Sequence, residues 1–400
     1  MEKKRLKIGV IFSCYVVLIP ILEYYKSPLN GFNMATFLAM AFLVLFAVLV
    51  GTRIAREWKI SLDGRMIPVW VYIAFMTFSV LICFSLYDYK YTWDNLSSYV
   101  RLLVLFFSIL VLGHHYFDFS VAMKFLEKLL VFCALLIFVQ DVLFIFFDIG
   151  VNINIPSLLM NRSYAVYPGR PGGLYMEPAH YAQSAVLYIC MFMFGNRKAL
   201  NLSWKSFVII CLGVVASGSG QGYLVLGLVY FLWVLDQIRL KNVTSQRLVL
   251  ASLSVVAVAS VCFVLLQIPF FQGVVSRFVG EDGSLGGLAL KGRTYTNALF
   301  KKLSETQQLF GVGFGFTKVV TVGYVNSLYS HLIQCGYLSL IPLGVIFAYL
   351  FFKGSSYVKA FAVLYAVMIC FSGVATPMAL CFYLSFLLFE RPMSKKRSLR

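Results

Sequence analysis

The sequence predicts an all-α protein: a polytopic helical integral membrane protein with about twelve transmembrane helices and two large external loops. Three observations lead to this fold class. Hydrophobic residues make up 60% of the 400 residues, and charged residues only 12%. The mean hydropathy of +0.84 is too high for a soluble domain. Apolar runs recur at lengths of about 15 to 25 residues, which suit helices that cross the hydrocarbon core of a bilayer.

The individual spans follow from these runs in chain order. The first run is followed by Pro20, Glu23 and Tyr24 instead of a small-residue cleavage site, so we expect a retained helix and not a signal peptide. The expected spans are 8–22, 32–51, 67–87, 98–116, 126–147, 179–195, 204–217, 222–238, 248–267, 326–352, 358–373 and 376–390. Because no internal repeat or low-complexity segment divides the chain, residues 1–400 are expected to form one membrane domain.

Lysine and arginine predict the orientation of these spans, because short cytoplasmic connections carry an excess of both. Basic connections alternate along the chain with nearly uncharged ones, which hold little beyond Lys26 and Lys90. This alternation predicts that both termini are cytoplasmic and that the number of spans is even. It also accounts for the net charge of +18, so no nucleic acid is expected as a partner.

Two connections, 148–178 and 268–325, are long enough to build a site outside the lipid, and both face outward in this topology. The first external loop carries Arg and Glu residues of a catalytic type. The second includes residues 294–310, in which apolar side chains recur at helical spacing. This spacing predicts an amphipathic helix that lies on the outer leaflet.

The most informative stretch is GRPGGLYMEPAHYA at 169–182, where ionisable residues gather at a membrane boundary. Arg170 is flanked by glycines and prolines, which fix a tight backbone and let a ligand come close. Glu177 and His180 lie three positions apart, nearly on one helix face, and can act as base and orienter on a hydroxyl. In the structural alternative, Glu177 only stabilises a helix N-terminus, by about 0.3 to 1 kcal/mol, and His180 contacts lipid headgroups.

Arginines from both external loops are candidate ligands for an anion. Arg293 precedes the expected amphipathic helix, where unpaired backbone amides favour anions. Arg162 and Arg277 lie elsewhere in the loops. Since guanidinium groups bind phosphate oxygens bidentately, arginines that converge from separate loops would suit a diphosphate at the membrane surface. Each arginine taken alone can equally be surface charge, because long translocated loops escape the positive-inside rule.

The sequence predicts no metal and no other cofactor. The four histidines lack metal-ligand spacing, and the nine cysteines all fall within hydrophobic spans, where they are expected to be packing residues. The glycine-rich GVGFGF at 311–316 follows no strand, so it is weak evidence for nucleotide binding. SGSGQG at 217–222 is expected to form a tight outward turn, in which the glycines can equally serve close helix packing.

Taken in order, these motifs resemble the Wzy-type O-antigen and capsular polysaccharide polymerases, which belong to the O-antigen polymerase/ligase superfamily. Arg170 to Pro178 is similar to the family pattern R-x-x-G-x-x-x-E-P before a central span, and SGSGQG is similar to its small-residue turn. Arg293, LFGVGFG at 309–315 and Asn326 are similar to the segment that closes the second external loop. The resemblance covers about residues 160–345.

Two positions depart from the family pattern. Val325 stands before Asn326, where O-antigen ligases typically carry His, and this favours a polymerase over a ligase. Gly220 stands in the small-residue turn where members often carry Arg, which argues against a catalytic role for that turn.

The resemblance implies a glycosyltransferase of the bacterial cytoplasmic (inner) membrane that transfers a growing glycan from undecaprenyl diphosphate to a hydroxyl of a lipid-linked repeat unit. The implied partners are the undecaprenyl-diphosphate-linked oligosaccharide, membrane lipids, a chain-length regulator and a flippase. The expected catalytic residues are Arg170, Glu177, His180 and Arg293. The expected substrate-binding residues are Arg162, Arg277, Asn326 and His331.

Two alternative functions remain open. An O-antigen ligase would use the same donor with lipid A core as its acceptor. A polysaccharide flippase or transporter commonly has polar residues at mid-membrane and discontinuous helices. The centres of the expected spans are almost wholly apolar, which favours chemistry at the membrane surface over passage through it.

Overall fold

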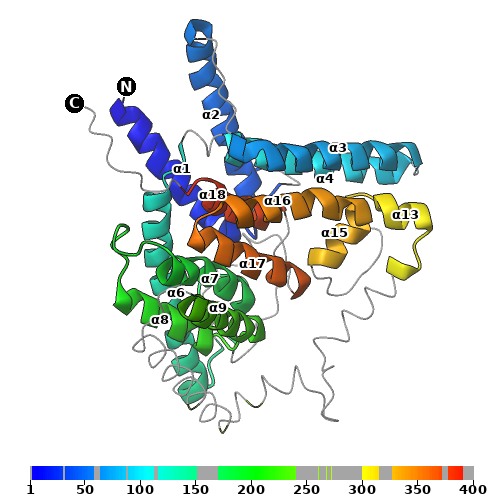
Figure 1. Cartoon of the computed structure of the whole chain (residues 1–400). Coiled ribbons are helices and arrows are strands. Elements are labelled where there is room, and N and C mark those ends of the chain that lie inside the picture. The colour runs from blue at the N-terminus through cyan, green and yellow to red at the C-terminus, as the bar shows by residue number, and fades with distance from the viewer. Residues whose placement is uncertain are drawn as a thin grey trace.

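The computed structural model describes residues 2–29, 32–57, 64–86, 89–111, 116–150, 170–239, 300–314, 327–371 and 377–390, together with residues 260, 267 and 272. Within these residues the regular secondary structure is helical, apart from an isolated backbone bridge between Lys26 and Asn33. The all-α prediction is therefore confirmed for the part of the chain that the structure describes (Figure 1).

Most of the described helices are longer than three turns, and short helical turns lie between some of them. In chain order the α-helices are α1 (Glu2–Leu22), α2 (Met34–Glu57), α3 (Ile67–Leu86), α4 (Tyr89–Phe106), α6 (Phe119–Phe147), α7 (Pro178–Phe194), α8 (Trp204–Ala216), α9 (Gly220–Arg239), α13 (Glu305–Phe310), α15 (Ser327–Cys335), α16 (Leu340–Lys353), α17 (Ser356–Phe371) and α18 (Pro377–Leu388). Short turns of 3-10 helix lie at Gly64–Met66 and Tyr337–Ser339, and a π-helical turn at Phe107–Val111 continues α4.

Three of the described helices have the length and apolar composition of a membrane span: Ile67–Leu86, Phe119–Phe147 and Gly220–Ile238. α15 and α16 add a fourth span if the bent pair counts as one. Six further apolar stretches of 10 to 17 residues lie in the described part, three of them within the longer helices α1, α2, and α4 with its π-helical turn. At about 1.5 Å per residue a stretch of this length is shorter than a hydrocarbon core of about 30 Å. The structure thus supports a helical membrane protein without supporting the number of twelve spans.

Large apolar side chains lie on the outside of the helices as well as between them. Ile145 and Phe146 of α6 are 70% and 73% exposed, and Phe352 of α16 is 74% exposed. α2 projects from the rest of the described helices (Figure 1) and also exposes apolar side chains such as Val44 and Val48. Soluble monomers rarely expose large apolar patches, whereas lipid accepts them. The exposed side chains therefore agree with a membrane location.

α7 is the central helix of the core. Every residue from Tyr181 to Phe192 is buried, as expected for a helix that is apolar all round. α6, α8, α9 and α17 contact it (Figure 1). The carboxylate of Glu127 on α6 joins three of these helices, because it accepts hydrogen bonds from the Tyr188 hydroxyl and from the Ser203 amide, both at 3.1 Å. These two bonds offset the cost of burying a carboxylate.

Helix ends that carry basic connections come together in the fold. α1 and the start of α6 meet where the Asp118 amide donates to Ser13 Oγ at 2.8 Å. The start of α8 lies beside them, because Lys124 Nζ donates to the Asn201 carbonyl at 2.7 Å. α17 reaches the same place through Tyr357, whose ring contacts the start of α6. These contacts bring several basic connections near one another, and their place on one side of a membrane stays a prediction.

The span expected at 326–352 is not one straight helix. α15 and the segment Tyr337–Lys353 meet at an angle of 118°. The break begins at Gly336, whose φ of 72° and ψ of 177° are accessible essentially only to glycine. The carbonyls of Ile333 and Gln334 at the end of α15 accept hydrogen bonds of 2.8 and 2.9 Å from the amides of Val312 and Gly313. The prediction of one continuous span was wrong because the chain turns at Gly336 and the segment after α13 completes the end of α15.

The amphipathic helix expected at 294–310 is also interrupted. Residues 294–299 lie outside the described residues, and in the described part α13 begins only at Glu305. Ser304 Oγ accepts from the Gln307 amide at 3.3 Å, and Gln307 Oε1 accepts from the Ser304 amide at 3.0 Å. This capping box starts a new helix. The prediction of one helix that runs unbroken through Ser304 was therefore wrong.

Candidate functional site

The segment before α7, which ends the loop expected to be external, folds back onto α6. The Gly173 amide donates to Gln140 Oε1 at 3.1 Å, and the Tyr175 amide donates to the Gly172 carbonyl at 3.0 Å. Gly173 has a φ of 63°, and a Cβ at this position would lie 2.9 Å from the Cys133 carbonyl oxygen. Gly173 therefore lets the loop approach the backbone of α6, and the close approach of a ligand to this motif stays a prediction.

A buried tyrosine anchors this turn to the start of α7. Tyr175 is 1% exposed, and its ring meets that of Tyr181 edge to face at a centroid distance of 5.8 Å. Burial raises the pKa of the Tyr175 hydroxyl well above its ordinary value, so the group stays protonated. Tyr175 is thus a packing residue. It anchors the segment that carries Arg170 before it and Glu177 after it in the sequence.

Glu177 and His180 lie together at the start of α7, and Arg170 lies seven residues before Glu177 in the segment that leads into this helix. Arg170 is half-buried, His180 is half-buried and Glu177 is exposed. Glu177 takes the extended N-cap conformation, with Pro178 as the first helical residue, yet its side chain makes no capping hydrogen bond. The carboxylate interacts electrostatically with His180. A carboxylate and an imidazole at the start of one helix provide two candidate proton acceptors, and a guanidinium group in the segment before the helix provides a cation.

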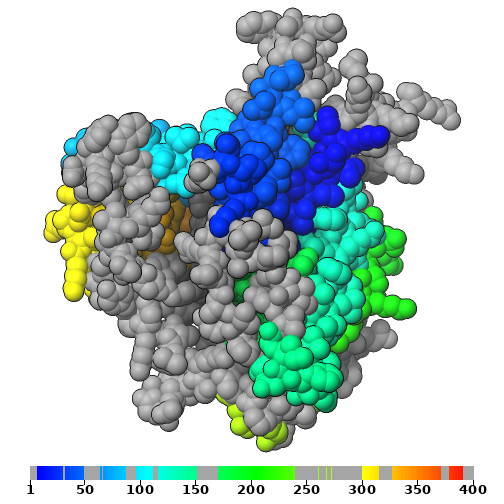
Figure 2. Space-filling model, turned by 180° about the vertical axis from the view of Figure 1, so that it is seen from behind, coloured from blue at the N-terminus to red at the C-terminus, as the bar shows by residue number. Residues whose placement is uncertain are grey.

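The connection between α1 and α2 supplies a fourth residue to this group. The Tyr24 hydroxyl lies 3.3 Å from His180 Nδ1 and 3.2 Å from Nε2, and the two rings stack at a centroid distance of 5.2 Å. The connection is ordered by the Lys26–Asn33 bridge and by Asn33, whose side chain accepts from the Thr36 amide at 2.8 Å. Figure 2, which shows the molecule from behind the view of Figure 1, has α1 and α2 side by side. Tyr24 was not among the candidate residues, because it precedes the stretch that carries the resemblance.

Replacing Tyr24 by phenylalanine is expected to leave the ring stack in place and to free the imidazole of His180. The lost hydrogen bond is worth about 1 kcal/mol, so His180 should react about fivefold faster with diethyl pyrocarbonate. Mass spectrometry of the peptide that contains His180 measures this rate. Tyr25→Phe is the matched control, since the described contacts of His180 do not include Tyr25. Equal rates in the two variants would show that Tyr24 does not hold the imidazole.

The small-residue turn at 217–222 lies beside the start of α7. Gly222 approaches α7 so closely that a Cβ would lie 3.1 Å from Ala182 Cβ and 2.8 Å from Val214 Cγ1. Gln183 Nε2 donates to Gln221 Oε1 at 2.9 Å. Gly222 therefore serves close helix packing, which is one of the roles that the sequence analysis left open for these glycines. The turn brings the second motif of the resemblance to the first.

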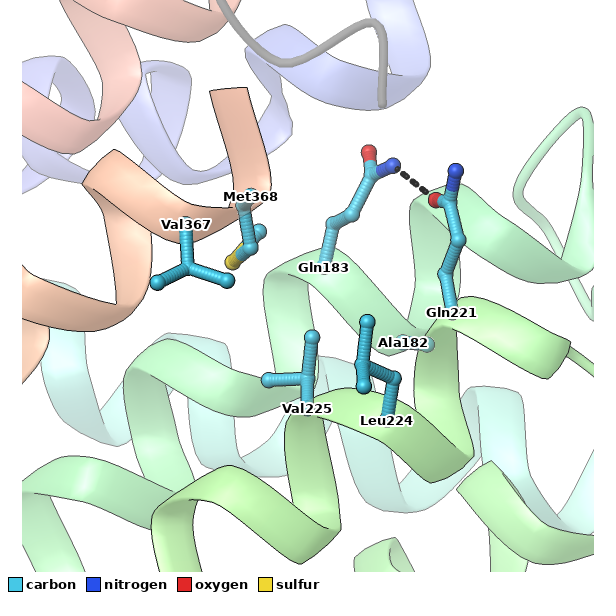
Figure 3. A pocket seen from close by; sticks show the side chains of 7 residues that line it. All are labelled: Ala182, Gln183, Gln221, Leu224, Val225, Val367 and Met368. Atoms are coloured by element: carbon cyan, nitrogen blue, oxygen red, sulfur yellow. Dashed lines mark hydrogen bonds between the residues drawn. The ribbon is translucent and has the colours of Figure 1, made fainter. Parts of the chain in front are cut away.

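A small cavity opens next to this contact (Figure 3). Its volume is about 10 Å³, which corresponds to roughly one water molecule. Gln183 and Gln221 stand on one side of the cavity, and Val367 and Met368 of α17 stand on the other (Figure 3). The remaining lining residues are Ala182, Leu224 and Val225.

His331 lies apart from the residues at the start of α7. It is 7% exposed, and its ring stacks on Tyr72 of α3 at a centroid distance of 5.9 Å. α17 contacts α15 as well as α7 and α9 and lies between them (Figure 1). The structure thus places His331 in the core, while its expected role in substrate binding stays a prediction.

Four of the expected site residues lie outside the described residues: Arg162, Arg277, Arg293 and Asn326. The convergence of arginines from two external loops therefore stays a prediction. Among the residues that are described, no group of three or more His, Cys, Asp or Glu side chains could hold a metal ion.

Polar residues within apolar helices were the signal that the sequence analysis did not use. Gln183 is 7% exposed near the start of the buried part of α7. Arg101 lies on α4, where its guanidinium donates to the Ser97 carbonyl at 3.1 Å and to Ser98 Oγ at 3.2 Å. Polar side chains in membrane helices are rare and commonly functional. Such residues could have been singled out from the sequence alone.

The chain matches no family model, no curated protein and no solved structure. The resemblance to polysaccharide polymerases accordingly depends on the motifs alone, and the function must be argued from the residues that the structure brings together.

Proposed function

We propose that the protein is a polysaccharide polymerase, a glycosyltransferase that moves a growing glycan from undecaprenyl diphosphate to a hydroxyl of a lipid-linked repeat unit. One observation carries the proposal. The two motifs at 169–182 and 217–222, which are separate in the sequence, meet near the start of α7, where Gly222 approaches Ala182 and Gln221 bonds to Gln183. The basic connections meet at other helix ends, which supports a membrane topology with this site on the outer side and both termini in the cytoplasm.

The side chains at the start of α7 suit this reaction. A guanidinium group at Arg170 stabilises the negative charge of the departing diphosphate. Glu177 or His180 accepts the proton of the attacking hydroxyl, and the exposed position of Glu177 leaves its carboxylate accessible to an acceptor. Because both substrates are lipid-linked, they reach such a site by lateral diffusion in the membrane, and the reaction requires no nucleotide.

Replacing Glu177 by glutamine is expected to slow chain lengthening by about 10²-fold or more, because a general base typically contributes 10²- to 10⁴-fold. The assay uses the purified protein in lipid nanodiscs with a lipid-diphosphate-linked repeat unit, and gel electrophoresis follows the ladder of products. Glu305→Gln is the matched control, since Glu305 is also an exposed glutamate at the start of a helix. Equal rates for wild type and Glu177→Gln would remove Glu177 from the chemistry.

A strain that lacks the protein tests the function as a whole. We expect its surface glycan to carry a single repeat unit. Unaltered long chains would refute the polymerase. Accumulation of lipid-linked polymer that is never transferred would instead identify a ligase.

One observation favours a second candidate, a flippase or transporter for lipid-linked glycans. The 118° break between α15 and the following segment is a discontinuous helix of the kind that transporters use. Proteoliposomes with a fluorescent lipid-linked oligosaccharide distinguish the two functions. Movement of the probe between leaflets without any change in its length would support the transporter, and lengthening without movement would support the polymerase.

A further inference from the structure

The start of α8 packs against the start of α6. Ser203, the N-cap residue of α8, donates from its amide to the buried carboxylate of Glu127 at 3.1 Å. Lys124, almost one turn earlier on α6, donates from Nζ to the Asn201 carbonyl at 2.7 Å. α6 and α8 contact each other beyond this point as well (Figure 1). The connection between α7 and α8 and the start of α6 therefore form one surface.

Lysines gather on this surface. Lys128, one turn after Lys124 on α6, is exposed, as are Lys198 in the connection and Lys205 in the first turn of α8. Lys124 is half-buried and uses one of its three donors on the Asn201 carbonyl. We call these four lysines the lysine cluster. The cluster brings ammonium groups from two helices and one connection to the same end of the helix pair.

Few acidic residues accompany the lysine cluster. The connection between α7 and α8 and α8 itself contain none. At the start of α6, Asp118 accepts from two backbone amides at 3.0 and 3.1 Å, and Glu127 accepts from an amide and a hydroxyl. Both carboxylates are thus engaged with donors of the protein. The guanidinium group of Arg197 is engaged as well, since it lies over two aromatic rings. Positive charge is therefore in excess on this surface.

Exposed apolar stripes begin beside the lysine cluster. Trp204, Val208 and Leu212 lie four residues apart on one face of α8, and all three are exposed. Phe132 and Leu135 form a similar exposed stripe on α6. Tryptophan is enriched where membrane helices meet the aqueous interface, and Trp204 stands at the start of its stripe. In a membrane, such stripes face the lipid tails, and the lysine cluster lies at the level of the headgroups.

We propose that the lysine cluster binds the phosphate of an anionic phospholipid, whose acyl chains lie along the exposed stripes of α6 and α8. Each lysine near an anionic lipid adds to the attraction and offers donors to the phosphate oxygens. A zwitterionic lipid carries a cation beside its phosphate, so it gains less from the lysines. A free phosphate has no chains and gains nothing from the stripes. This site does not depend on the proposed function, because it involves none of the residues expected to carry the chemistry.

Native mass spectrometry of the full-length protein in detergent micelles tests this site. The protein is titrated with phosphatidylglycerol, which is anionic, and with phosphatidylcholine, which is zwitterionic. Wild type should bind phosphatidylglycerol about 100-fold more tightly, since the three exposed lysines contribute a factor of roughly five each. The triple variant Lys128→Gln, Lys198→Gln and Lys205→Gln should bind the two lipids with nearly equal affinity. Lys124 is left in place because it also holds Asn201.

The matched control removes the same charge from exposed lysines outside α6 and α8, through Lys301→Gln, Lys302→Gln and Lys353→Gln. This variant should keep the wild-type preference. Equal affinities of wild type for the two lipids would overturn the site, and so would a preference that survives in the triple variant of the lysine cluster. Displacement of the bound lipid by an equal concentration of glycerol phosphate would also overturn it, because the surface would then recognise a free anion. If the triple variant does not fold, Lys205→Glu replaces it, and the preference should fall by about 10-fold.

Discussion

Replacing Arg170 by alanine is expected to slow chain lengthening about 10²- to 10³-fold. A positively charged or hydrogen-bonding group aimed at charge that develops in the transition state is typically worth about 3 to 4 kcal/mol. Arg170 is half-buried, where its interaction with a diphosphate is screened less than in water. Initial rates of ladder formation by the protein in nanodiscs measure the effect. Arg170→Lys should fall between wild type and alanine, because an ammonium group retains the charge but not the bidentate fork.

Arg197→Ala is the control for this substitution. Arg197 follows the C-terminal end of α7, and its guanidinium lies over the rings of Phe192 and Trp204 at 5.3 and 4.9 Å. Its loss removes the same charge from the opposite end of the same helix, at a cost to stability of about 1 kcal/mol. Chain lengthening is expected to continue at the wild-type rate. If Arg170→Ala and Arg197→Ala were equally active, the arginine at the start of α7 would have no part in the reaction.

Composition and hydropathy were sufficient to predict the class of fold. Apolar runs give helices wherever lipid or a helical core surrounds them, because every backbone polar group must then be paired within its own segment. The positions of most described helices follow from this rule. The number of membrane spans does not follow, because helices such as α8 and α18 are short, and hydropathy does not distinguish a short span from a buried core helix.

The two incorrect helix predictions share a physical origin. Both predictions followed the apolar pattern and took no account of residues within it that begin or end a helix. Ser304 and Gln307 form a capping box that starts a helix within the expected amphipathic segment. Gly336 takes a conformation that ends α15. The capping box is visible in the sequence, whereas the need for glycine at 336 depends on the close approach of Leu309, which only tertiary structure reveals.

The candidate site was predicted in part. The sequence identified Arg170, Glu177 and His180 because ionisable residues are rare in so apolar a chain. It did not identify Tyr24 or Gln183, since each contributes through a contact with a residue that is distant in sequence or lies on another helix. The spacing of residues within one segment does not predict which polar side chains from different segments become neighbours in the folded protein.

Replacing Gly336 by alanine is expected to destabilise the protein by about 3 to 5 kcal/mol. A Cβ at this position would lie 2.2 Å from the Leu309 carbonyl oxygen and 2.5 Å from the Phe310 amide nitrogen. These are backbone atoms, so the clash is relieved only if the chain moves. Forcing alanine into a conformation that only glycine adopts readily adds about 1 to 3 kcal/mol of strain, and the steric overlap adds a similar amount. The midpoint of thermal unfolding in detergent micelles measures the loss.

Gly344→Ala is the matched control, because Gly344 lies in the next helix and a Cβ there would meet nothing within 4 Å. Alanine favours a helix over glycine by about 0.5 to 1 kcal/mol, so this variant should be as stable as wild type or more stable. A stable Gly336→Ala protein would contradict the bent arrangement directly. Alanine at 336 also favours a continuous helix, so unchanged stability would mean that residues 326–352 form the straight span that the hydropathy pattern alone predicts.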